Sequence, residues 1–192
     1  MHRWMLAAAL TVGGAIAGCA APAINLHAPN TFLDSHDLTV MTNKMAVAIA
    51  ADPVIVRLTE HGPMTIVLTR LKNETNDLIP PSEGDMFLQR MRVLLTAHAA
   101  LRRRFVFVLN PATLRHLRQQ QGLAATAWGP RQGGISPRYA LQATFYADTH
   151  VAPKDRSDYY LCTFFLTNIQ SGQVLWEGSY ETKKMTHESF LY

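Results

Sequence analysis

Residues 139–181 read YALQATFYADTHVAPKDRSDYYLCTFFLTNIQSGQVLWEGSYE, and the periodicity of this stretch predicts three consecutive strands. Apolar and polar side chains alternate over residues 139–147, which is typical of a strand with one face in water. Residues 159–169 are apolar on both faces, so we expect this strand near the centre of a sheet. Residues 174–181 alternate again. Two polar turns separate the strands, at residues 151–158 and 168–173, and they predict an antiparallel meander.

Helical and strand patterns alternate upstream of this meander. In chain order they predict a helix capped by Ser35 or Asp37 and ended by Asp52-Pro53, a strand at 64–71, a helix begun by a capping box of Ser82 and Asp85, a strand at 105–109, and a helix from Pro111 to Gln121. Residues 54–58 fit either type of element. The segments at 72–81 and 123–137 are expected to be loops.

This order of elements, αβαβαβββ, predicts an α/β fold. Helices can cover one face of a mixed sheet whose last three strands form the meander, which gives a two-layer sandwich. The chain has 192 residues and shows no internal repeat, so we expect one compact domain. A domain of this size buries enough apolar surface to fold without a metal or a disulfide framework.

The N-terminus carries an export signal. Met1-His2-Arg3 is basic, and the uncharged run WMLAAALTVGGAIAG at residues 4–18 is shorter than the roughly 20 residues that span a bilayer. The run ends in Ile16-Ala17-Gly18-Cys19, which resembles the bacterial lipobox. In such signals the cysteine is acylated and the chain is cut before it. The alternative interpretation is a buried N-terminal helix with an incidental cysteine.

The lipobox divides the chain into three parts. We expect a signal peptide at residues 1–18, a lipidated tether at 19–35 and a globular domain at 36–192. The tether reaches about 50 Å when fully extended. Ala20 follows the cysteine where aspartate would resemble the signal for retention at the inner membrane. We therefore expect an outer-membrane protein, lipid-anchored on the periplasmic face.

Charge and cysteine content narrow the classes of partner. The net charge of +4 comes from 18 basic and 14 acidic residues, a mild excess that does not by itself indicate nucleic-acid binding. Export removes the chain from nucleic acid in any case. If Cys19 carries lipid, Cys162 is left without a disulfide partner. It lies in an apolar strand and is expected to be a small buried side chain.

Catalytic and metal-binding motifs are lacking in the sequence. No histidine pair has zinc-ligand spacing, and no nucleophile elbow or phosphate loop occurs. We therefore expect no catalytic residue, no metal and no cofactor, and a protein that is not an enzyme. His98 lies on an apolar helix stripe and is interpreted as a hydrogen-bonded core residue. Four neighbouring acidic residues could hold a cation, but a polar loop and a helix start explain them more simply: Glu74, Asp77, Glu83 and Asp85.

Two groups of residues are candidates for binding. Arg102, Arg103 and Arg104 follow one another at a predicted helix end, where they either offset the helix dipole or contact an anionic partner. Trp128 and Arg131 lie in a loop rich in glycine and proline, and exposed tryptophan and arginine are common in binding hot spots. Trp128 could equally fold back over the sheet.

Several segments together resemble the lipid-anchored LpoB-type activators of penicillin-binding proteins. The resemblance spans most of residues 37–184. It rests on the lipobox, on Asp37-Leu38 and Lys44-Met45 in the first helix, on Leu71-Lys72-Asn73-Glu74-Thr75 after a strand, on Tyr139-Ala140-Leu141-Gln142-Ala143, and on the hairpin at 168–176 with Lys183-Lys184 beyond it.

This resemblance implies a fold similar to the N-terminal domain of TolB and a non-catalytic role. It implies an outer-membrane lipoprotein that contacts a penicillin-binding protein, a peptidoglycan synthase, and stimulates cell-wall synthesis. Better-known members of the family have a long linker through the wall, whereas the predicted tether here is short. An alternative function is a lipoprotein assembly factor of a secretion or appendage system.

Overall fold

The computed structural model describes residues 23–25, 31–120, 135–153 and 155–187. Its helices are α1 (Ser35–Ala51), α2 (Pro53–Glu60), α3 (Pro81–Thr96), α4 (Ala99–Arg104) and α5 (Pro111–Gln120). Its strands are β1 (Ala23–Asn25), β2 (Met64–Leu68), β3 (Lys72–Glu74), β4 (Phe105–Val108), β5 (Tyr139–Val151), β6 (Asp155–Asn168) and β7 (Val174–His187).

One mixed sheet contains all of these strands. Its order is β1-β7-β6-β5-β2-β4, and β3 pairs with β5 outside this path. Strands β5, β6 and β7 are antiparallel neighbours, whereas β2 runs parallel to both β4 and β5. The predicted meander and the predicted central position of the apolar strand, now β6, are both confirmed.

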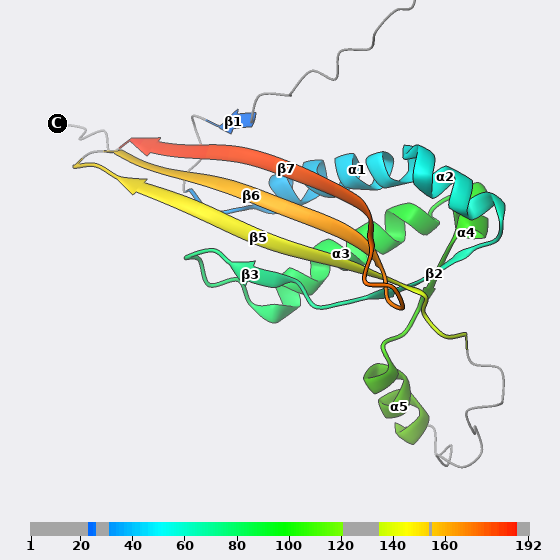
Figure 1. Ribbon diagram of the computed structural model, residues 1–192. Helices are drawn as coiled ribbons and strands as arrows, with labels where there is room; N and C mark the ends of the chain where they lie inside the picture. Colours follow the sequence, from blue (N-terminus) through cyan, green and yellow to red (C-terminus); the bar gives the residue numbers. More distant parts are fainter. Residues whose placement is uncertain (1–22, 26–30, 121–134, 154, 188–192) are drawn as a thin grey trace, which may run out of the picture.

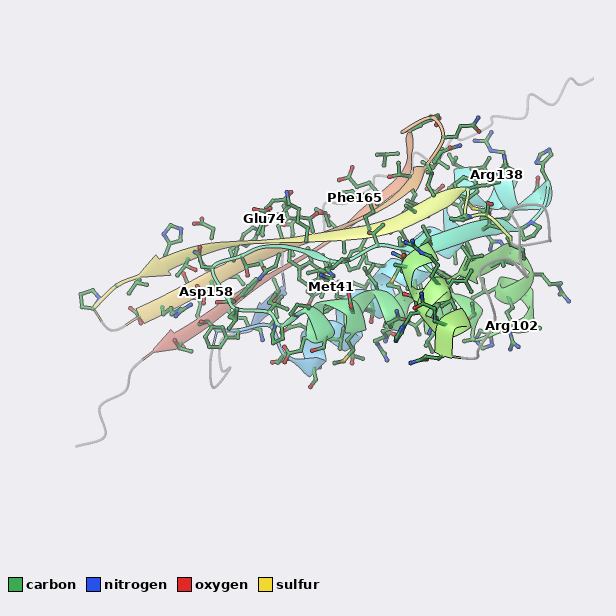
Figure 2. The ribbon with its side chains drawn as sticks, turned by 90° about the horizontal axis from the view of Figure 1, so that it is seen from below. Met41, Glu74, Arg102, Arg138, Asp158 and Phe165 are labelled. Atoms are coloured by element: carbon green, nitrogen blue, oxygen red, sulfur yellow. The ribbon has the colours of Figure 1, made fainter. Side chains whose placement is uncertain are left out.

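Helices α1 and α3 cover one face of this sheet, so the predicted two-layer α/β sandwich is confirmed (Figure 1). Figure 2 shows Met41 between the helices and the sheet, while Phe165 and Glu74 lie on the face that no helix covers. The core is built where the apolar stripe of each helix meets the inner face of the strands. Its members include Met41, Met45, Ile49, Leu88, Met91, Leu141, Phe145, Phe164 and Leu166.

The inner face of β6 is the most completely buried part of the sheet. Tyr160, Cys162, Phe164 and Leu166 alternate along it and are at most 1% exposed. Cys162 is therefore the buried small side chain that the sequence predicts. Burial, followed by the nearby charge of Asp37, raises the pKa of its thiol well above the ordinary value. A thiol in this state is a poor nucleophile.

A glycine on β7 makes room for an aromatic side chain. Trp176 is 6% exposed, and its predicted position in the core is confirmed. A Cβ atom at Gly178 would lie 2.6 Å from the Trp176 ring and 2.9 Å from the sulfur of Met45. Gly178 thus lets the indole pack flat along the strand beneath α1.

The strands of the meander are longer than the sequence indicates. Strand β5 runs to Val151 and β6 begins at Asp155. The predicted turn at 151–158 is therefore too long, because only residues 152–154 lie between the strands. The polar residues there, such as Asp158, are paired across the ladder with β5 and β7. Backbone hydrogen bonds, which do not depend on side-chain polarity, extend the strands beyond the apolar pattern.

Three local expectations are corrected. The ambiguous residues 54–58 are helical and belong to α2, which Asp52 caps through its side chain. Strand β3 interrupts the predicted loop at 72–81. The capping box of Ser82 and Asp85 is absent, because α3 begins directly at Pro81 without a side-chain cap. Proline is favoured at the first helical position because its fixed φ suits the helix and it brings no unpaired amide there.

Among the helices of the described ranges, none alone is long and apolar enough to cross a bilayer. Helices α1 and α2 meet that test of length and composition only together, as a pair bent by 57°.

Candidate functional site

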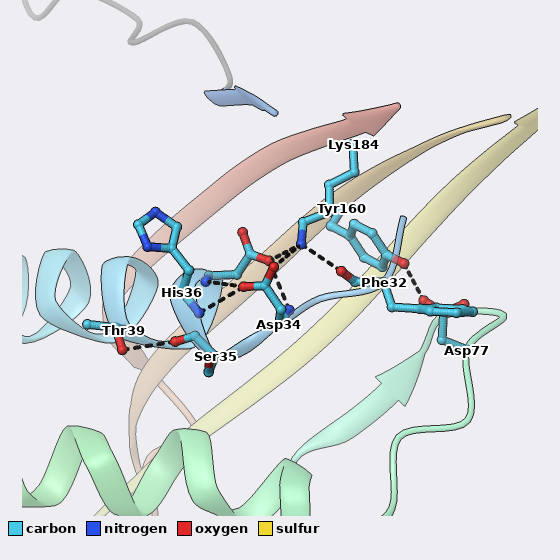
Figure 3. A network of polar contacts seen from close by, with 9 residues as sticks. Phe32, Asp34, Ser35, His36, Thr39, Asp77, Tyr160 and Lys184 are labelled. Atoms are coloured by element: carbon cyan, nitrogen blue, oxygen red, sulfur yellow. Dashed lines mark hydrogen bonds and ion pairs between the residues drawn. The ribbon is translucent and has the colours of Figure 1, made fainter. Parts of the chain in front are cut away.

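A buried lysine joins the N-terminal segment to the end of the sheet (Figure 3). The side chain of Lys184 on β7 is 0% exposed, and its Nζ donates hydrogen bonds to the Phe32 carbonyl at 2.6 Å and to the Asp34 carboxylate at 2.9 Å. It also forms an ion pair with the carboxylate of Asp37 at 2.5 Å. We call Lys184, Asp34, Asp37 and the Phe32 carbonyl the lysine node.

The first turn of α1 organises the carboxylates of this node. The Asp34 side chain accepts from the backbone amides of His36 and Asp37, and the Asp37 side chain accepts from the Asp34 amide. This reciprocal arrangement is a capping box. The two acids cap the helix and bind the lysine at once, so the node fixes the start of α1 against β7.

Electrostatics keep the node charged at neutral pH. Burial disfavours the ionised form of Asp34, but hydrogen bonds from Lys184 and the backbone, with the lysine charge, lower its pKa below 3.8. Burial likewise opposes the charge of Lys184, and the hydrogen bonds and charges of Asp37 and Asp34 raise its pKa above 10.5. A paired, permanently charged cluster of this kind positions chain segments and offers no free base or nucleophile.

A second buried polar contact lies beside the node. The Tyr160 hydroxyl donates a short hydrogen bond to Asp77, and Figure 3 shows this pair next to Lys184. Burial and the Asp77 carboxylate raise the pKa of Tyr160 far above its ordinary value. Asp77 therefore anchors the loop after β3 to the sheet. No cluster of three or more metal-binding side chains occurs among residues 31–120, 135–153 and 155–187.

An apolar groove lies at the other end of α1. Five residues form its α1 wall: Asn43, Ala46, Val47, Ala50 and Ala51. The end of α3 and α4 supply the facing wall, with Leu94, Ala97, His98, Leu101 and Arg104. The groove has a volume of about 460 Å³, and Val47 is 69% exposed in it. We call it the α1–α4 groove.

The three consecutive arginines occupy different environments, and only Arg104 lines this groove. Arg104 is half-buried and holds helices together: it donates from Nε to the Thr59 hydroxyl at 3.0 Å and from Nη1 to the Ala50 carbonyl at 2.9 Å. Arg102 donates to the Thr96 carbonyl, and Arg103 is exposed. All three lie in the last turn of α4, where cations offset the negative end of the dipole.

Sequence reasoning misplaced His98. It does not lie on the buried stripe of α3, because that helix ends at Thr96 and His98 is the exposed N-cap of α4. The change of helix between positions 96 and 99 rotates it out of the core. Its ring lines the α1–α4 groove instead.

Some candidate residues lie outside the described residues. These are Cys19, Trp128 and Arg131, with the signal peptide and most of the predicted tether. Of the candidates that the structure does describe, Arg102 to Arg104 are brought together with the apolar wall of α1, which the sequence did not single out.

The sequence contains a signal for the lysine node that pattern reading missed. An even number of positions separates Trp176, Tyr180 and Lys184 on β7, so their side chains point to the same face of the sheet, the inner one. A lysine on that face needs a buried acid within reach. The sequence signal for the groove is weaker. Val47 is an apolar residue that does not share the helical spacing of the buried Met41, Met45 and Ile49.

One family profile matches the chain. The sequence profile of the family described as "Peptidoglycan-synthase activator LpoB" matches residues 37–182. A comparison with curated proteins finds no match.

Several solved structures are similar to parts of this chain. The LpoB C-terminal domain from Escherichia coli is 18% identical over 76% of this chain and 98% of that chain, with a TM-score of 0.46. The corresponding domain from Salmonella enterica is 14% identical over 68% of this chain and 93% of that chain, with a TM-score of 0.37. Lipoprotein GNA1162 from Neisseria meningitidis is 18% identical over 67% and 88%, with a TM-score of 0.35. Because the family profile covers most of the globular domain, the chain belongs to the LpoB family of peptidoglycan-synthase activators.

Proposed function

We propose that this protein is a lipid-anchored envelope protein that binds a penicillin-binding protein and stimulates its synthesis of peptidoglycan. The family match over residues 37–182 carries this proposal. The lipobox ending at Cys19 supports the anchor, and Ala20 supports the outer membrane. The protein acts as a regulator by surface contact, without chemistry of its own.

The α1–α4 groove is the proposed contact surface. Its lining is mostly apolar and includes Arg104, and Arg102 and Arg103 precede Arg104 in the last turn of α4. The groove therefore suits a partner segment with one or two apolar side chains flanked by acidic residues. Exposed apolar side chains grouped in a concave surface are typical of interaction sites. Trp128 and Arg131 in the loop before β5 are proposed as further contacts.

Strand β1 sets the reach of the anchor. The N-terminal segment joins the sheet at Ala23–Asn25, which pair with β7. If Cys19 carries the lipid, residues 19–22 lie before this strand and reach about 14 Å when fully extended, instead of the roughly 50 Å expected for a tether at 19–35. The proposal therefore requires a synthase that extends towards the membrane that holds the anchor.

Activation follows from unequal binding to two states of the partner. A protein that binds the active state of the synthase more tightly shifts the population towards that state. A tenfold shift requires about 1.4 kcal/mol of differential binding free energy, which a few apolar contacts and one ion pair supply.

The contact surface can be tested with two matched valine variants. Val47→Glu puts a charge into the groove, and Val151→Glu puts the same charge at an exposed valine at the far end of β5. We expect Val47→Glu to lower stimulation of glycan polymerisation by a purified penicillin-binding protein at least tenfold. Val151→Glu should behave like the unmodified protein. Equal activation by both variants would remove the groove from the proposal while leaving the family role untouched.

The anchor can be tested separately. Mass spectrometry of native protein purified from membranes should find a chain that begins at an acylated Cys19. Cys19→Ser should release the protein into the soluble fraction. An unprocessed N-terminus, or a soluble native protein, would contradict the anchored part of the proposal.

A further inference from the structure

A second concave surface lies at the carboxyl ends of two parallel strands, away from the α1–α4 groove. Strands β2 and β4 are parallel neighbours, and the residues that follow them, Thr69, Arg70, Leu109 and Asn110, line a pocket of about 240 Å³. In α/β sheets, ligands bind in crevices outside the carboxyl ends of parallel strands. The first turn of α5 closes the pocket with Thr113.

Helix α3 presents a mixed stripe to the same pocket. Asp85, Leu88, Gln89 and Arg92 follow one another at helical spacing and all line it. Leu88 is 1% exposed and forms part of the apolar wall together with Phe107. The polar members Gln89 and Arg92 are left to face the opening.

The two arginines of the pocket have no partner in the described part of the chain. Neither the Arg70 nor the Arg92 guanidinium forms a hydrogen bond or an ion pair there, and Asp85 forms no ion pair with either within 4.0 Å. Arg104, by contrast, donates to the Thr59 hydroxyl and to the Ala50 carbonyl, although its Nη2 is buried without a partner. The pocket thus holds free guanidinium forks, the donors that match an oxyanion in two places at once.

We propose that this pocket binds a single carboxylate on a ligand the size of one amino-acid side chain. Two arginines and Asp85 leave the pocket with one net positive charge, which matches a monoanionic carboxylate better than a doubly charged phosphate. The volume is below that of most small-molecule sites, which start at about 300 Å³. The apolar wall suits the methylene groups behind the carboxylate. This proposal does not depend on the proposed function.

The test is a titration of the purified full chain followed by the backbone amide signals of Gln89, Asn110 and Thr113. The probes are propionate, inorganic phosphate and N-acetylglutamic acid α-amide, which we call the diamide because its amine is acetylated and its α-carboxyl is amidated. The diamide carries only the side-chain carboxylate and both flanking amides, so it stands for an acidic residue in a peptide. Propionate stands for a free small acid. We expect saturable shifts with a dissociation constant near 1 mM for the carboxylates and weaker binding of phosphate.

The two carboxylate probes distinguish the source of the ligand. Binding of the diamide at least tenfold tighter than propionate indicates an acidic side chain of a peptide. Equal affinities indicate a free carboxylic acid. Both results support the site, whereas shifts that never saturate, or phosphate binding more tightly than both carboxylates, overturn it.

Charge-matched variants separate the pocket from the general surface. The double variant Arg70→Gln, Arg92→Gln should weaken carboxylate binding at least tenfold, and Asp85→Asn should strengthen it severalfold by removing a repulsive charge. Arg103→Gln changes the same net charge on an exposed arginine outside the pocket and should have no effect. An equal loss in Arg103→Gln, or weaker binding in Asp85→Asn, contradicts the proposal. Unchanged melting temperatures show that the variants are folded.

Discussion

The two ends of helix α1 handle the same physical problem in opposite ways. At its N-terminus, the lysine node buries the charged side chains of Lys184 and Asp37 and pairs them with each other, and the 45% exposed Asp34 also pairs with the lysine. At its C-terminal half, the α1–α4 groove leaves apolar side chains such as Val47 in water. Buried charges and grouped exposed apolar residues are the two departures from the usual distribution that carry information.

The difference separates structure from function within one helix. Burying an ion pair costs desolvation free energy, and only good geometry offsets that cost. We therefore interpret the node as a structural feature that specifies where two chain segments meet. Exposed apolar surface costs free energy with nothing inside the chain to recover it, so the groove is expected to be covered by another molecule. Stability measurements should therefore be sensitive to the node, and binding measurements to the groove.

Removal of Lys184 should give the largest effect. Lys184→Met leaves the buried carboxylate of Asp37 without its partner, and such losses cost about 3–5 kcal/mol of unfolding free energy. Urea denaturation measures the change. Lys183→Met is the control, because Lys183 is the neighbour on the other face of β7 and should cost less than about 0.5 kcal/mol. If the two variants lost equal stability, the node would not be the structural device described here.

Acid should weaken the node next. The lowered pKa of Asp34 means that its ionised form is favoured by folding, so its contribution is present above pH 3.8 and is lost as the pH falls through the folded-state pKa. The raised pKa of Lys184 has the opposite effect on the pH dependence of stability. Its contribution is present at lower pH and is lost only as the pH rises beyond 10.5. Urea midpoints between about pH 7 and pH 2 should fall less steeply in Asp34→Asn. Asp158, whose pKa is lowered by hydrogen bonds from Thr149, Thr31 and Arg156 despite its burial, keeps a residual acid sensitivity in that variant. Parallel curves for both proteins would argue against a charged node.

Substitutions in the groove should barely change stability. Val47 is 69% exposed, so Val47→Glu should alter the unfolding free energy by about 0.5 kcal/mol or less. The activation assay should nevertheless register a large loss for this variant. A loss of several kcal/mol in urea would mean that Val47 is part of the core and that the groove is a packing defect.

The smallest effect is expected from the charge of Arg103, in the last turn of α4. Arg103 is exposed, and it takes no part in the hydrogen bonds that Arg104 makes to Thr59 and Ala50. Arg103→Glu should slow association with an acidic partner severalfold at low salt, and the difference should shrink at higher ionic strength. Stopped-flow or surface-based kinetics over a salt series measures this. An effect independent of salt would exclude long-range attraction as its cause.

Much of the fold was predictable because its signals are local. Alternation over residues 139–147 and the apolar run at 159–169 depend only on neighbours in sequence, and they led to the correct meander and the correct central strand. The ends of these strands were not predictable, because ladder hydrogen bonds extend β5 to Val151 and start β6 at Asp155 through polar residues. The predicted capping box of α3 was also wrong, because the helix begins at Pro81 without a side-chain cap.

The candidate site was less accessible to sequence reasoning. Arg102 to Arg104 were visible as a run of charge, but only the structure separates the half-buried Arg104 from the exposed Arg103. Val47 gave no motif at all. It matters because α3 and α4 place Leu94 and Leu101 opposite it, a contact between residues about 50 positions apart.

Residue order alone was enough to determine the class of fold, the family resemblance and the prediction of an acylated Cys19, because periodicity and short motifs are properties of adjacent residues. Tertiary structure alone decided that Lys184 finds Asp34 and Asp37 across some 150 positions, and that an apolar wall of α1 remains uncovered beside α4. The physical reason is that burial is a property of the packed whole. A charged side chain links two segments only when distant parts of the chain enclose it and its partner. A valine contributes to a contact surface only when the packed chain leaves it exposed to water.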